Sequence, residues 1–541
     1  MKLSNFQLKT ILFLFFSSLF CNSCTTFKEK ETVAGKPNII VIMADDMGYS
    51  DIGCYGGEAK TPNLDRLAGE GLRFTQFYNA ARCCPTRASL LTGIYPHEAG
   101  MGGMVNPPKG HADNPFYQGF LNENCITLAE VLKTAGYYTA MSGKWHVGEE
   151  RPHWPTDRGF DNYFGLISGA MNYWDISRSK QPGIKRHFAI DSSEHTPSNK
   201  DFYMTDAITE NAVKYIEKAD SLQQPFFLYV AYTAPHWPLH AWPEDIAKYE
   251  GKFMAGWDSL RRARYERMIR MRILPGNLEM SPRDANVKAW NSLSEEKKTE
   301  MDLYMAIYAA QIDRMDQGIG KIMDQLDAVG KMENTLILFL SDNGGCAEGG
   351  IWGQNFWSEM GEPGEPGTAN SYLSYGQSWA NLSNTPFREY KHWVHEGGIA
   401  TPLIAHWPAK IFDKGGLTSQ VGHITDIMAT CCDVAGVEYP KTFKGKEIRP
   451  LRGKSLLPVF EGELTEPRGF IFWEHEGNRA ARLNDWKIVA KKGQPWELYH
   501  VNNDRTELHN LAGDSTKIVS KMVEAYQKWA TETQVIEYAV K

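Results

Sequence analysis

The sequence predicts an α/β fold with a large mixed, mostly parallel sheet flanked by helices, followed by a small C-terminal α+β domain with an antiparallel sheet. Short, continuous apolar runs recur between residues 38 and 405 and alternate with helical patterns, as buried parallel strands do. Several of these runs end directly in polar or ionisable residues. After about Gly462 the pattern changes to short, closely spaced strands and one helix.

The first expected strand is NIIVIMA at 38–44, which continues into Asp45-Asp46. Other strands of the large sheet are expected at 72–77, 137–141, 225–232, 335–340 and 402–405, with helices at 127–134 and 301–326. The charged stretch 242–300 predicts surface helices, and the Gly/Pro/Trp-rich stretch 349–386 predicts a long loop. The C-terminal strands are expected at 470–475, 480–489 and 496–500, before a helix at 515–531.

Length indicates how many domains to expect, and charge indicates which partners are unlikely. A chain of 541 residues exceeds one ordinary domain, so we expect a catalytic domain at 36–461 and a subdomain at 462–541. Lys plus Arg number 58 and Asp plus Glu number 65, giving a net charge of −7. Without a basic stripe, nucleic acid is not an expected partner.

The N-terminus has the layout of a signal peptide over residues 1–24. Lys2 and Lys9 precede an apolar run at 10–20, which is too short to span a bilayer. Ser23 before Cys24 is typical of a lipoprotein processing site, with Cys24 as the acylated residue; secretion with cleavage nearby is the alternative. A polar linker follows at 25–35. We therefore expect export to the periplasm or cell surface, with membrane contact only through a lipid anchor.

A cysteine lies where a helix is expected to begin. The segment Cys83-Cys84-Pro85-Thr86-Arg87 follows the strand at 72–77, and the helix is expected to start near Pro85. A helix N-terminus favours an anion. From these residues alone, Cys83 as a reactive group and Cys83 as a structural cysteine are both open.

Oxygen ligands follow two of the expected strands. Asp45 and Asp46 end one strand, and Asp342-Asn343 ends another. Carboxyl ends of strands meet at one edge of an open α/β sheet. Four hard oxygen donors favour calcium or magnesium over zinc, although either pair alone also suits a helix cap or a tight turn.

Two lysines and two histidines complete the candidate set. Lys144 and His146 occur in Gly-Lys-Trp-His after the strand at 137–141, and His236 follows Pro235 after the strand at 225–232. Lys391 lies five residues before Glu396. Lysine offers a point charge for an anion, and histidine exchanges protons near neutral pH.

The Cys-x-Pro-x-Arg motif followed by Leu91-Thr92-Gly93 resembles the signature of type I sulfatases, which are similar to alkaline phosphatases in fold. The resemblance implies that a separate maturase converts Cys83 to formylglycine (3-oxoalanine). It also implies one Ca²⁺ per chain, with these ligands: Asp45, Asp46, Asp342, Asn343 and the modified Cys83. Two departures are Thr86, where serine is commoner, and Ala400, where many members have arginine.

The resemblance also implies a mechanism for a sulfuric ester hydrolase. One hydroxyl of the hydrated formylglycine, positioned by Arg87, attacks the sulfur of the ester. Lys144 and Lys391 bind the sulfate oxygens, together with the cation and the helix N-terminus. His236 protonates the departing sugar oxygen, and His146 accepts the proton of the second hydroxyl as sulfate leaves. The expected substrate is a sulfated carbohydrate, cleaved in an exo manner.

Two alternatives stay open. A phosphatase or phosphodiesterase of the same superfamily would bind a similar tetrahedral group. A non-catalytic surface lipoprotein that binds sulfated glycans would leave Cys83 unmodified. The residues indicate neither the sugar nor the sulfate position; the 349–386 loop and Trp473-Glu474-His475 are the candidate determinants.

Overall fold

The computed structural model describes residues 35–111, 113–178, 186–197, 201–355, 364–463 and 465–539. Residues Lys36–Lys541 form one compact unit. The predicted signal peptide, Cys24 and nearly all of the predicted linker lie outside the described residues. Within the described ranges, no helix combines the length and the apolar character needed to cross a membrane.

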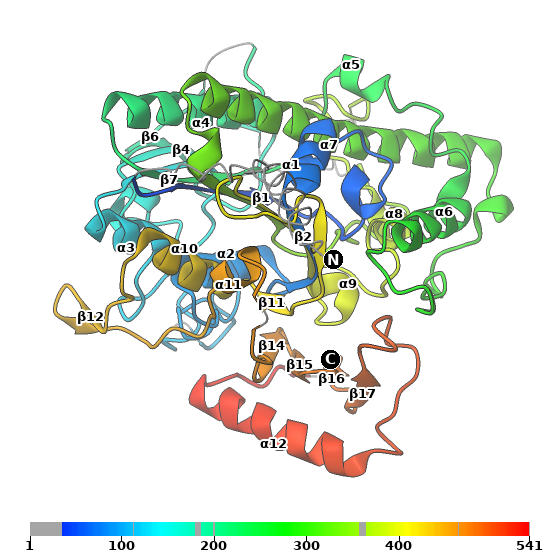
Figure 1. Ribbon diagram of the computed structural model, residues 1–541. Helices are drawn as coiled ribbons and strands as arrows, with labels where there is room; N and C mark the ends of the chain where they lie inside the picture. Colours follow the sequence, from blue (N-terminus) through cyan, green and yellow to red (C-terminus); the bar gives the residue numbers. More distant parts are fainter. Residues whose placement is uncertain are drawn as a thin grey trace, which may run out of the picture. The chain divides into compact units, whose positions relative to one another are not determined.

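A mixed sheet of eleven strands lies at the centre (Figure 1). Its order is β10-β2-β9-β8-β1-β7-β3-β4-β5-β6, and β11 pairs with β2. Strand β1 is parallel to β7 and β8, and β3 is parallel to β4 and β7, whereas β9 is antiparallel to β2 and β8. The strands are β1 (Asn38–Ala44), β2 (Leu72–Tyr78), β3 (Tyr138–Gly143), β4 (Asn162–Leu166), β5 (Phe188–Ile190), β6 (Ser193–Glu194), β7 (Phe226–Ala231), β8 (Thr335–Ser341), β9 (Ala400–His406), β10 (Gly416–Thr418) and β11 (Gly422–His423). The predicted large, mostly parallel sheet is confirmed.

Helices cover both faces of this sheet (Figure 1). Helices α1, α4 and α7 pack on one face and α2, α3 and α10 on the other. The helices are α1 (Pro62–Glu70), α2 (Cys83–Thr92), α3 (Leu128–Thr134), α4 (Met204–Ser221), α5 (Pro243–Ile246), α6 (Gly256–Arg270), α7 (Glu295–Ala328), α8 (Gly376–Ser383), α9 (Glu396–Ile399), α10 (Asp426–Ala435) and α11 (Leu457–Phe460). Short 3-10 helices lie at Gly53–Tyr55, Pro155–Arg158, Trp290–Ser292 and Met332–Asn334, and a hairpin pairs β12 (Thr442–Phe443) with β13 (Lys446–Glu447).

Strand β1 shows why its sequence is a continuous apolar run. Ile40 and Ile42 pack in the core on one face of the sheet, while Ile39, Val41 and Met43 pack in the core on the other. All five side chains are buried. Successive side chains point to opposite faces of the sheet, and both faces are covered. Apolar residues are therefore favoured at every one of these positions until the strand ends.

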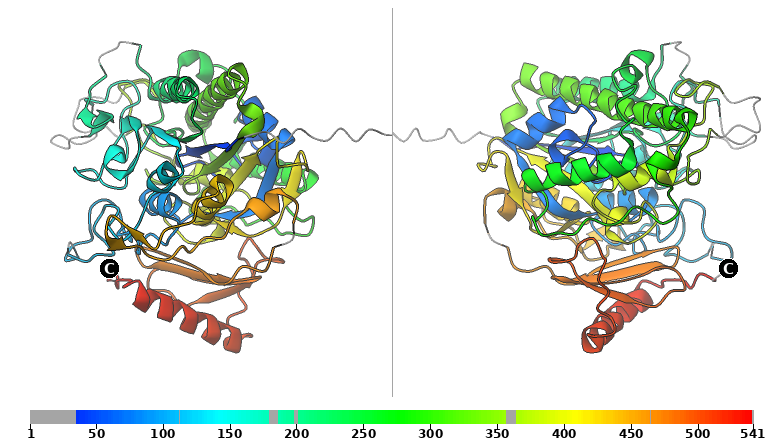
Figure 2. Two further views of the ribbon diagram at one scale, coloured as in Figure 1. Left: turned by 60° about the vertical axis from the view of Figure 1, so that its left-hand side comes forward. Right: turned by 90° about the vertical axis from the view of Figure 1, so that its right-hand side faces the viewer.

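The C-terminal part forms a second, antiparallel sheet covered by helix α12 (Thr516–Glu532) (Figure 2). Its strands are β14 (Ile471–His475), β15 (Asn478–Leu483), β16 (Trp486–Ala490) and β17 (Glu497–His500). The antiparallel α+β arrangement is confirmed. The single strand predicted at 480–489 is wrong, because the chain reverses at Asn484, whose φ is 52°, and forms a tight hairpin.

Two other predictions need correction. The stretch 242–300 is not only surface: Trp257 and Trp290 are buried, and their rings lie 4.8 Å apart. The predicted loop 349–386 contains helix α8, whose Trp379 packs 5.2 Å from Trp257. Most side chains of α8 are buried, so the segment lacks the one-sided apolar stripe by which a surface helix is identified.

Candidate active site

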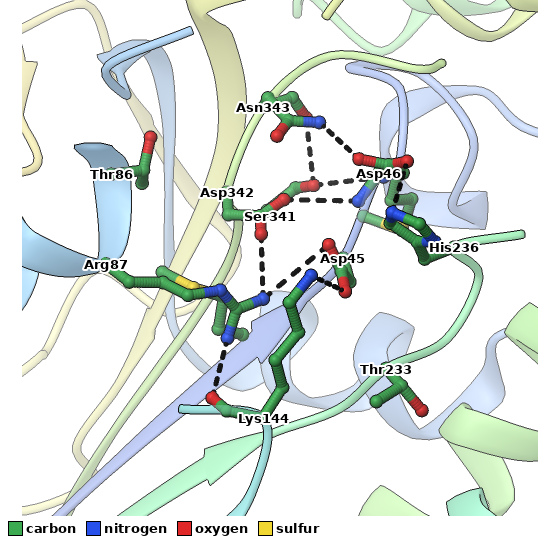
Figure 3. A network of polar contacts seen from close by, with 12 residues as sticks. Asp45, Asp46, Thr86, Arg87, Lys144, Thr233, His236, Ser341, Asp342 and Asn343 are labelled. Atoms are coloured by element: carbon green, nitrogen blue, oxygen red, sulfur yellow. Dashed lines mark hydrogen bonds and ion pairs between the residues drawn. The ribbon is translucent and has the colours of Figure 1, made fainter. Parts of the chain in front are cut away.

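The predicted site residues meet at the carboxyl edge of the large sheet. Figure 3 shows seven of them: Asp45, Asp46, Arg87, Lys144, His236, Asp342 and Asn343. Asp45 follows β1, Asp342 follows β8 and Lys144 follows β3, and these strands share one direction with β7. Gly143 has a φ of 123°, and a Cβ there would lie 1.9 Å from the carbonyl oxygen of Ala231. Only glycine therefore allows β3 to turn at this point into Lys144.

The acidic and amide groups form one buried cluster. The Asp46 backbone N–H donates to Asp342 Oδ1 at 3.1 Å, and Asn343 Nδ2 donates to Asp46 Oδ1 at 2.8 Å. Asp45 Oδ1 and Asn343 Oδ1 are buried and find no hydrogen-bond partner among the described residues. Asp45 Oδ1 lies 3.7 Å from Arg87 Nη2, beyond hydrogen-bond distance. Buried oxygens without a hydrogen-bond donor are costly unless a ligand or an ion meets them.

Burial makes the ionised forms of two carboxylates in the cluster costly. Burial raises the pKa of Asp45, and burial together with Asp45 raises the pKa of Asp342 to about 8. Against burial, His236 and Lys391 hold the pKa of Asp46 below its ordinary value. Carboxylates with raised pKa values beside unpaired oxygens fit a hard divalent cation.

Each carboxylate also forms an ion pair with a basic side chain, and Arg87 is shared between Asp342 and Asp45. These contacts place basic groups around the same small volume, where they can hold the oxygens of an anionic substrate. The ion pairs are Lys144 Nζ with Asp45 Oδ2 at 2.7 Å, Arg87 Nη2 with Asp342 Oδ2 at 2.7 Å, and Lys391 Nζ with Asp46 Oδ2 at 2.8 Å. Figure 3 shows the first two converging from different elements.

Cys83 is the first residue of helix α2, which begins two residues before the predicted start at Pro85. Thr86 Oγ1 accepts a hydrogen bond from the Ala80 N–H at 2.9 Å and closes the turn before the helix. Hydrogen bonding from Cys84, with the charge of Lys144, lowers the pKa of the Cys83 thiol well below its ordinary value despite burial. The cysteine therefore lies in an anion-stabilising setting.

The two histidines lie beside different members of the site, His146 beside Cys83 and His236 beside Asp46. Burial lowers the pKa of His146 to about 4, and its ring hydrogen-bonds to the Cys83 thiol. Burial, with Lys391 and Lys144, also lowers the pKa of His236 to about 4. His236 Nε2 lies 3.4 Å from Lys391 Nζ. The structure thus brings together all of the predicted catalytic and metal-ligating residues, whereas Cys24 lies outside the described residues.

A further group, formed by His392, His475 and Glu476, has metal-ligating atoms within 4.8 Å of one another. Asn478 Nδ2 donates to the His475 carbonyl oxygen and lies 3.1 Å from His392 Nε2, which places the His392 proton on Nδ1, 3.3 Å from Glu476. Both ring nitrogens of His392 are then engaged. The side chain of His475 is not part of this arrangement, because neither of its buried ring nitrogens finds a hydrogen-bond partner among the described residues.

The sequence did not reveal several neighbours of the site. Arg82, Glu348 and Trp237 form contacts directly beside Cys83 and His236. The only cue was position, since Arg82 and Trp237 adjoin predicted residues and Glu348 lies in a glycine-rich turn after Asn343. Gly169 is also hidden in sequence: a Cβ there would lie 2.4 Å from His146 Nε2.

Known proteins match this chain over most of its length. The family model described as Sulfatase matches residues 37–437, and the model described as N-sulphoglucosamine sulphohydrolase, C-terminal, matches 388–532. The chain belongs to the sulfatase family. An uncharacterised sulfatase of Schizosaccharomyces pombe is 34% identical, covering 94% of this chain and 96% of the relative.

Other relatives agree with membership of the sulfatase family. An arylsulfatase of Klebsiella aerogenes is 34% identical over 78% of this chain and 92% of its own. An N-acetylgalactosamine-6-sulfatase of Canis lupus familiaris is 27% identical, and the match covers 89% of this chain and 77% of the relative. The crystal structure of Ps i-CgsB in complex with k-i-k-neocarrahexaose superposes with a TM-score of 0.67 at 28% identity. The match covers 94% of this chain and 95% of Ps i-CgsB. The protein is therefore a sulfuric ester hydrolase with the alkaline phosphatase-like fold of this family.

Proposed function

We propose that this sulfatase hydrolyses terminal sulfate esters of carbohydrates, using formylglycine made from Cys83 and a calcium ion. The observation that carries the proposal is the convergence of Cys83 with the acidic cluster and its paired bases at one sheet edge. A phosphatase of the same fold and a silent sulfate binder are the alternatives that the experiments below separate.

Conversion of Cys83 is supported by its place at the start of α2, where the thiol has a lowered pKa. Mass spectrometry of the peptide that contains Cys83, from protein made with a formylglycine-generating maturase, tests it. We expect CHO in place of CH₂SH at Cys83 and an intact thiol at Cys84. An unmodified Cys83 in protein that hydrolyses sulfate esters would contradict the proposal.

Calcium is supported by the oxygen-only donor set of Asp45, Asp46, Asp342 and Asn343. A bound Ca²⁺ supplies positive charge that neutralises the carboxylates and polarises a sulfate oxygen. We expect about one calcium per chain by elemental analysis, and a higher thermal midpoint when Ca²⁺ is returned to chelated protein. Two zinc ions per chain would favour a phosphatase.

The chain's own residues supply binding and proton transfer. Lys144 and Lys391 hold the charged sulfate oxygens, and Arg87 orients the residue at position 83. His236 protonates the departing oxygen of the sugar, and His146 accepts a proton beside position 83. Because the pKa of His236 is low in the free site, the negative charge of the bound sulfate ester must raise it before His236 can act as the acid. These roles follow from the family resemblance and agree with the contacts made by each side chain.

A terminal carbohydrate sulfate is supported by the burial of the side chains that would bind it. Lys391 is 4% exposed and His236 6% exposed, so access suits a chain end better than a chain interior. One relative is named for an N-acetylgalactosamine sulfate, and Ps i-CgsB binds an oligosaccharide. Desulfation of a panel of sulfated monosaccharides tests this. Turnover of aryl sulfates alone would contradict the carbohydrate substrate.

We also propose export, with a lipid on Cys24. The support is the sequence of residues 1–24, with its apolar run and Ser23-Cys24. Metabolic labelling with a fatty acid, compared between the native chain and Cys24→Ala, tests it. Equal labelling of the two chains would contradict acylation at Cys24, and label-free protein in the culture medium would indicate secretion.

A further inference from the structure

The carboxylate of Glu348 joins the two segments that carry Cys83 and His236. Glu348 Oε1 lies 2.9 Å from Arg82 Nη2, and Glu348 Oε2 accepts a hydrogen bond from Trp237 Nε1 at 2.9 Å. Arg82 directly precedes Cys83, and Trp237 directly follows His236. One side chain therefore bridges the start of α2 and the segment after β7.

The environment of Glu348 keeps it ionised. Lys391, with Arg82, lowers its pKa to about 2 in spite of partial burial. Its hydrogen bond to Trp237 is therefore charge-assisted, which makes it stronger and more directional than a neutral one. The Glu348 side chain is 35% exposed, at the rim of a site whose other members are nearly inaccessible.

Trp237 transmits this contact to His236. The two rings are stacked, with centroids 5.5 Å apart and an angle of 25° between their planes. His236 Nδ1 also contacts the carbonyl oxygen of Trp237. A shift of the indole would therefore move the imidazole relative to Asp46 and Lys391, and small misplacements of a catalytic group cost much of its effect.

We propose that Glu348 is a positioning residue: anchored by Arg82, it holds Trp237 and so fixes His236 for protonation of the leaving group. This inference rests on the proposed function, in which His236 is the acid. It assigns no contact between Glu348 and the reacting atoms.

The identity of the leaving group provides a direct test. Expelling a sugar alkoxide requires a proton, whereas nitrophenolate leaves readily without one. Misplacing His236 should therefore slow desulfation of a sulfated sugar much more than hydrolysis of 4-nitrophenyl sulfate. A purely structural role for Glu348 would slow both substrates alike.

The experiment compares Glu348→Ala, Glu348→Gln and Trp237→Phe in matured, calcium-loaded enzyme. We expect kcat for the sugar sulfate to fall at least about tenfold in Glu348→Ala, less in Glu348→Gln, which keeps an acceptor, and within about threefold for the aryl sulfate. Trp237→Phe removes the indole N–H, leaves Arg82 paired and should reproduce the selective loss. The double variant Glu348→Ala/Trp237→Phe should lose no more than the larger single loss.

Glu461→Gln is the matched control. Like Glu348, Glu461 has a partly exposed side chain (33%) in an ion pair, with Lys410 at 2.6 Å, and it lies far from Glu348 in the sequence. It should leave both activities unchanged. Equal losses on the two substrates, additive effects, or a change in KM alone would overturn the positioning role. A wild-type enzyme that carries formylglycine yet hydrolyses no sulfate ester would instead overturn the proposed function.

Discussion

Four non-glycine residues in and beside the candidate active site have left-handed backbone conformations. The φ angles are 66° for Asp46, 66° for Ala81, 56° for His146 and 90° for His392. Each such residue costs on the order of 1–3 kcal/mol, which persists only where surrounding contacts fix the chain. The strain lies where strands must deliver side chains into one small volume, so the geometry of the site is obtained at the expense of stability.

Gly169 lies against one of these strained residues and should be intolerant of any side chain. A Cβ at Gly169 would lie 2.4 Å from both Cε1 and Nε2 of His146. We expect Gly169→Ala to displace the imidazole and to lower kcat at least about tenfold, because a misplaced proton acceptor loses most of its effect. Steady-state kinetics, with thermal unfolding as a check on folding, measures this.

The control for that variant is Gly69→Ala. Gly69 lies in helix α1, and a Cβ there would meet nothing within 4 Å. Alanine is favoured over glycine inside a helix by up to about 1 kcal/mol, so stability should be unchanged or higher and activity unchanged. Full activity in Gly169→Ala would show that His146 moves without consequence and would contradict its proposed role.

At the scale of elements, the sequence allows those site residues to be predicted that directly follow a buried strand. The run at β1 is recognisable because both faces are covered, and parallel strands share one carboxyl edge, so Asp45 and Asp342 could be placed together. The pairing of Lys391 with Asp46 could not be derived from periodicity, because it depends on contacts between segments far apart in the chain. Glu348 was missed for the same reason.

A buried ionic network links α9 to the C-terminal sheet. Lys487 of β16 lies 2.9 Å from Glu396 of α9 and 2.8 Å from Glu507, and all three are inaccessible to solvent. Tyr78, the last residue of β2, donates to Glu396 at 2.9 Å. Because β2 leads into the segment before Cys83, the network supports the entry to helix α2.

Removing the lysine of this network should be strongly destabilising. Lys487→Met leaves the carboxylates of Glu396 and Glu507 buried with one cation fewer, and we expect a loss of about 3–5 kcal/mol in the free energy of unfolding by urea. The control is Lys491→Met, whose pair with Glu389 is 42% exposed on the lysine side and should change stability by at most about 1 kcal/mol. Equal, small effects would contradict a supporting role for the network.

The same network gives a pH dependence with a definite sign. Against burial, Lys487 and Arg505 lower the pKa of Glu396 from 4.5 to about 2. Its contribution to stability is therefore present above about pH 4.5 and lost as the pH falls towards 2. Urea unfolding can be measured between roughly pH 3 and pH 6, which is the accessible part of this window. As the pH falls through this range, the free energy of unfolding should decrease less in Glu396→Gln than in the wild type. Parallel curves for the two proteins would contradict this assignment.

At the scale of the whole molecule, the C-terminal part of the chain contacts β2 and the residues that lead from β2 to Cys83. Trp473 Nε1 of β14 donates to the Asn79 carbonyl oxygen at 2.8 Å, and Arg505 donates to the Thr75 carbonyl oxygen of β2. The two sheets have separate topologies, and the boundary at 461/462 stays a prediction. Their shared buried contacts nevertheless favour one cooperative structure, consistent with a single compact unit over Lys36–Lys541.

We therefore expect residues 36–541 to unfold in a single transition. Partial unfolding of the C-terminal sheet would leave Glu396 without Lys487 and Arg505, and would expose the apolar face of β14, so an intermediate of that kind is unfavourable. Calorimetry should give equal calorimetric and van't Hoff enthalpies, and near-UV and far-UV circular dichroism should change together. Loss of activity should follow the same curve. Two resolved transitions, with sulfatase activity surviving the first, would instead define 462–541 as an independent domain.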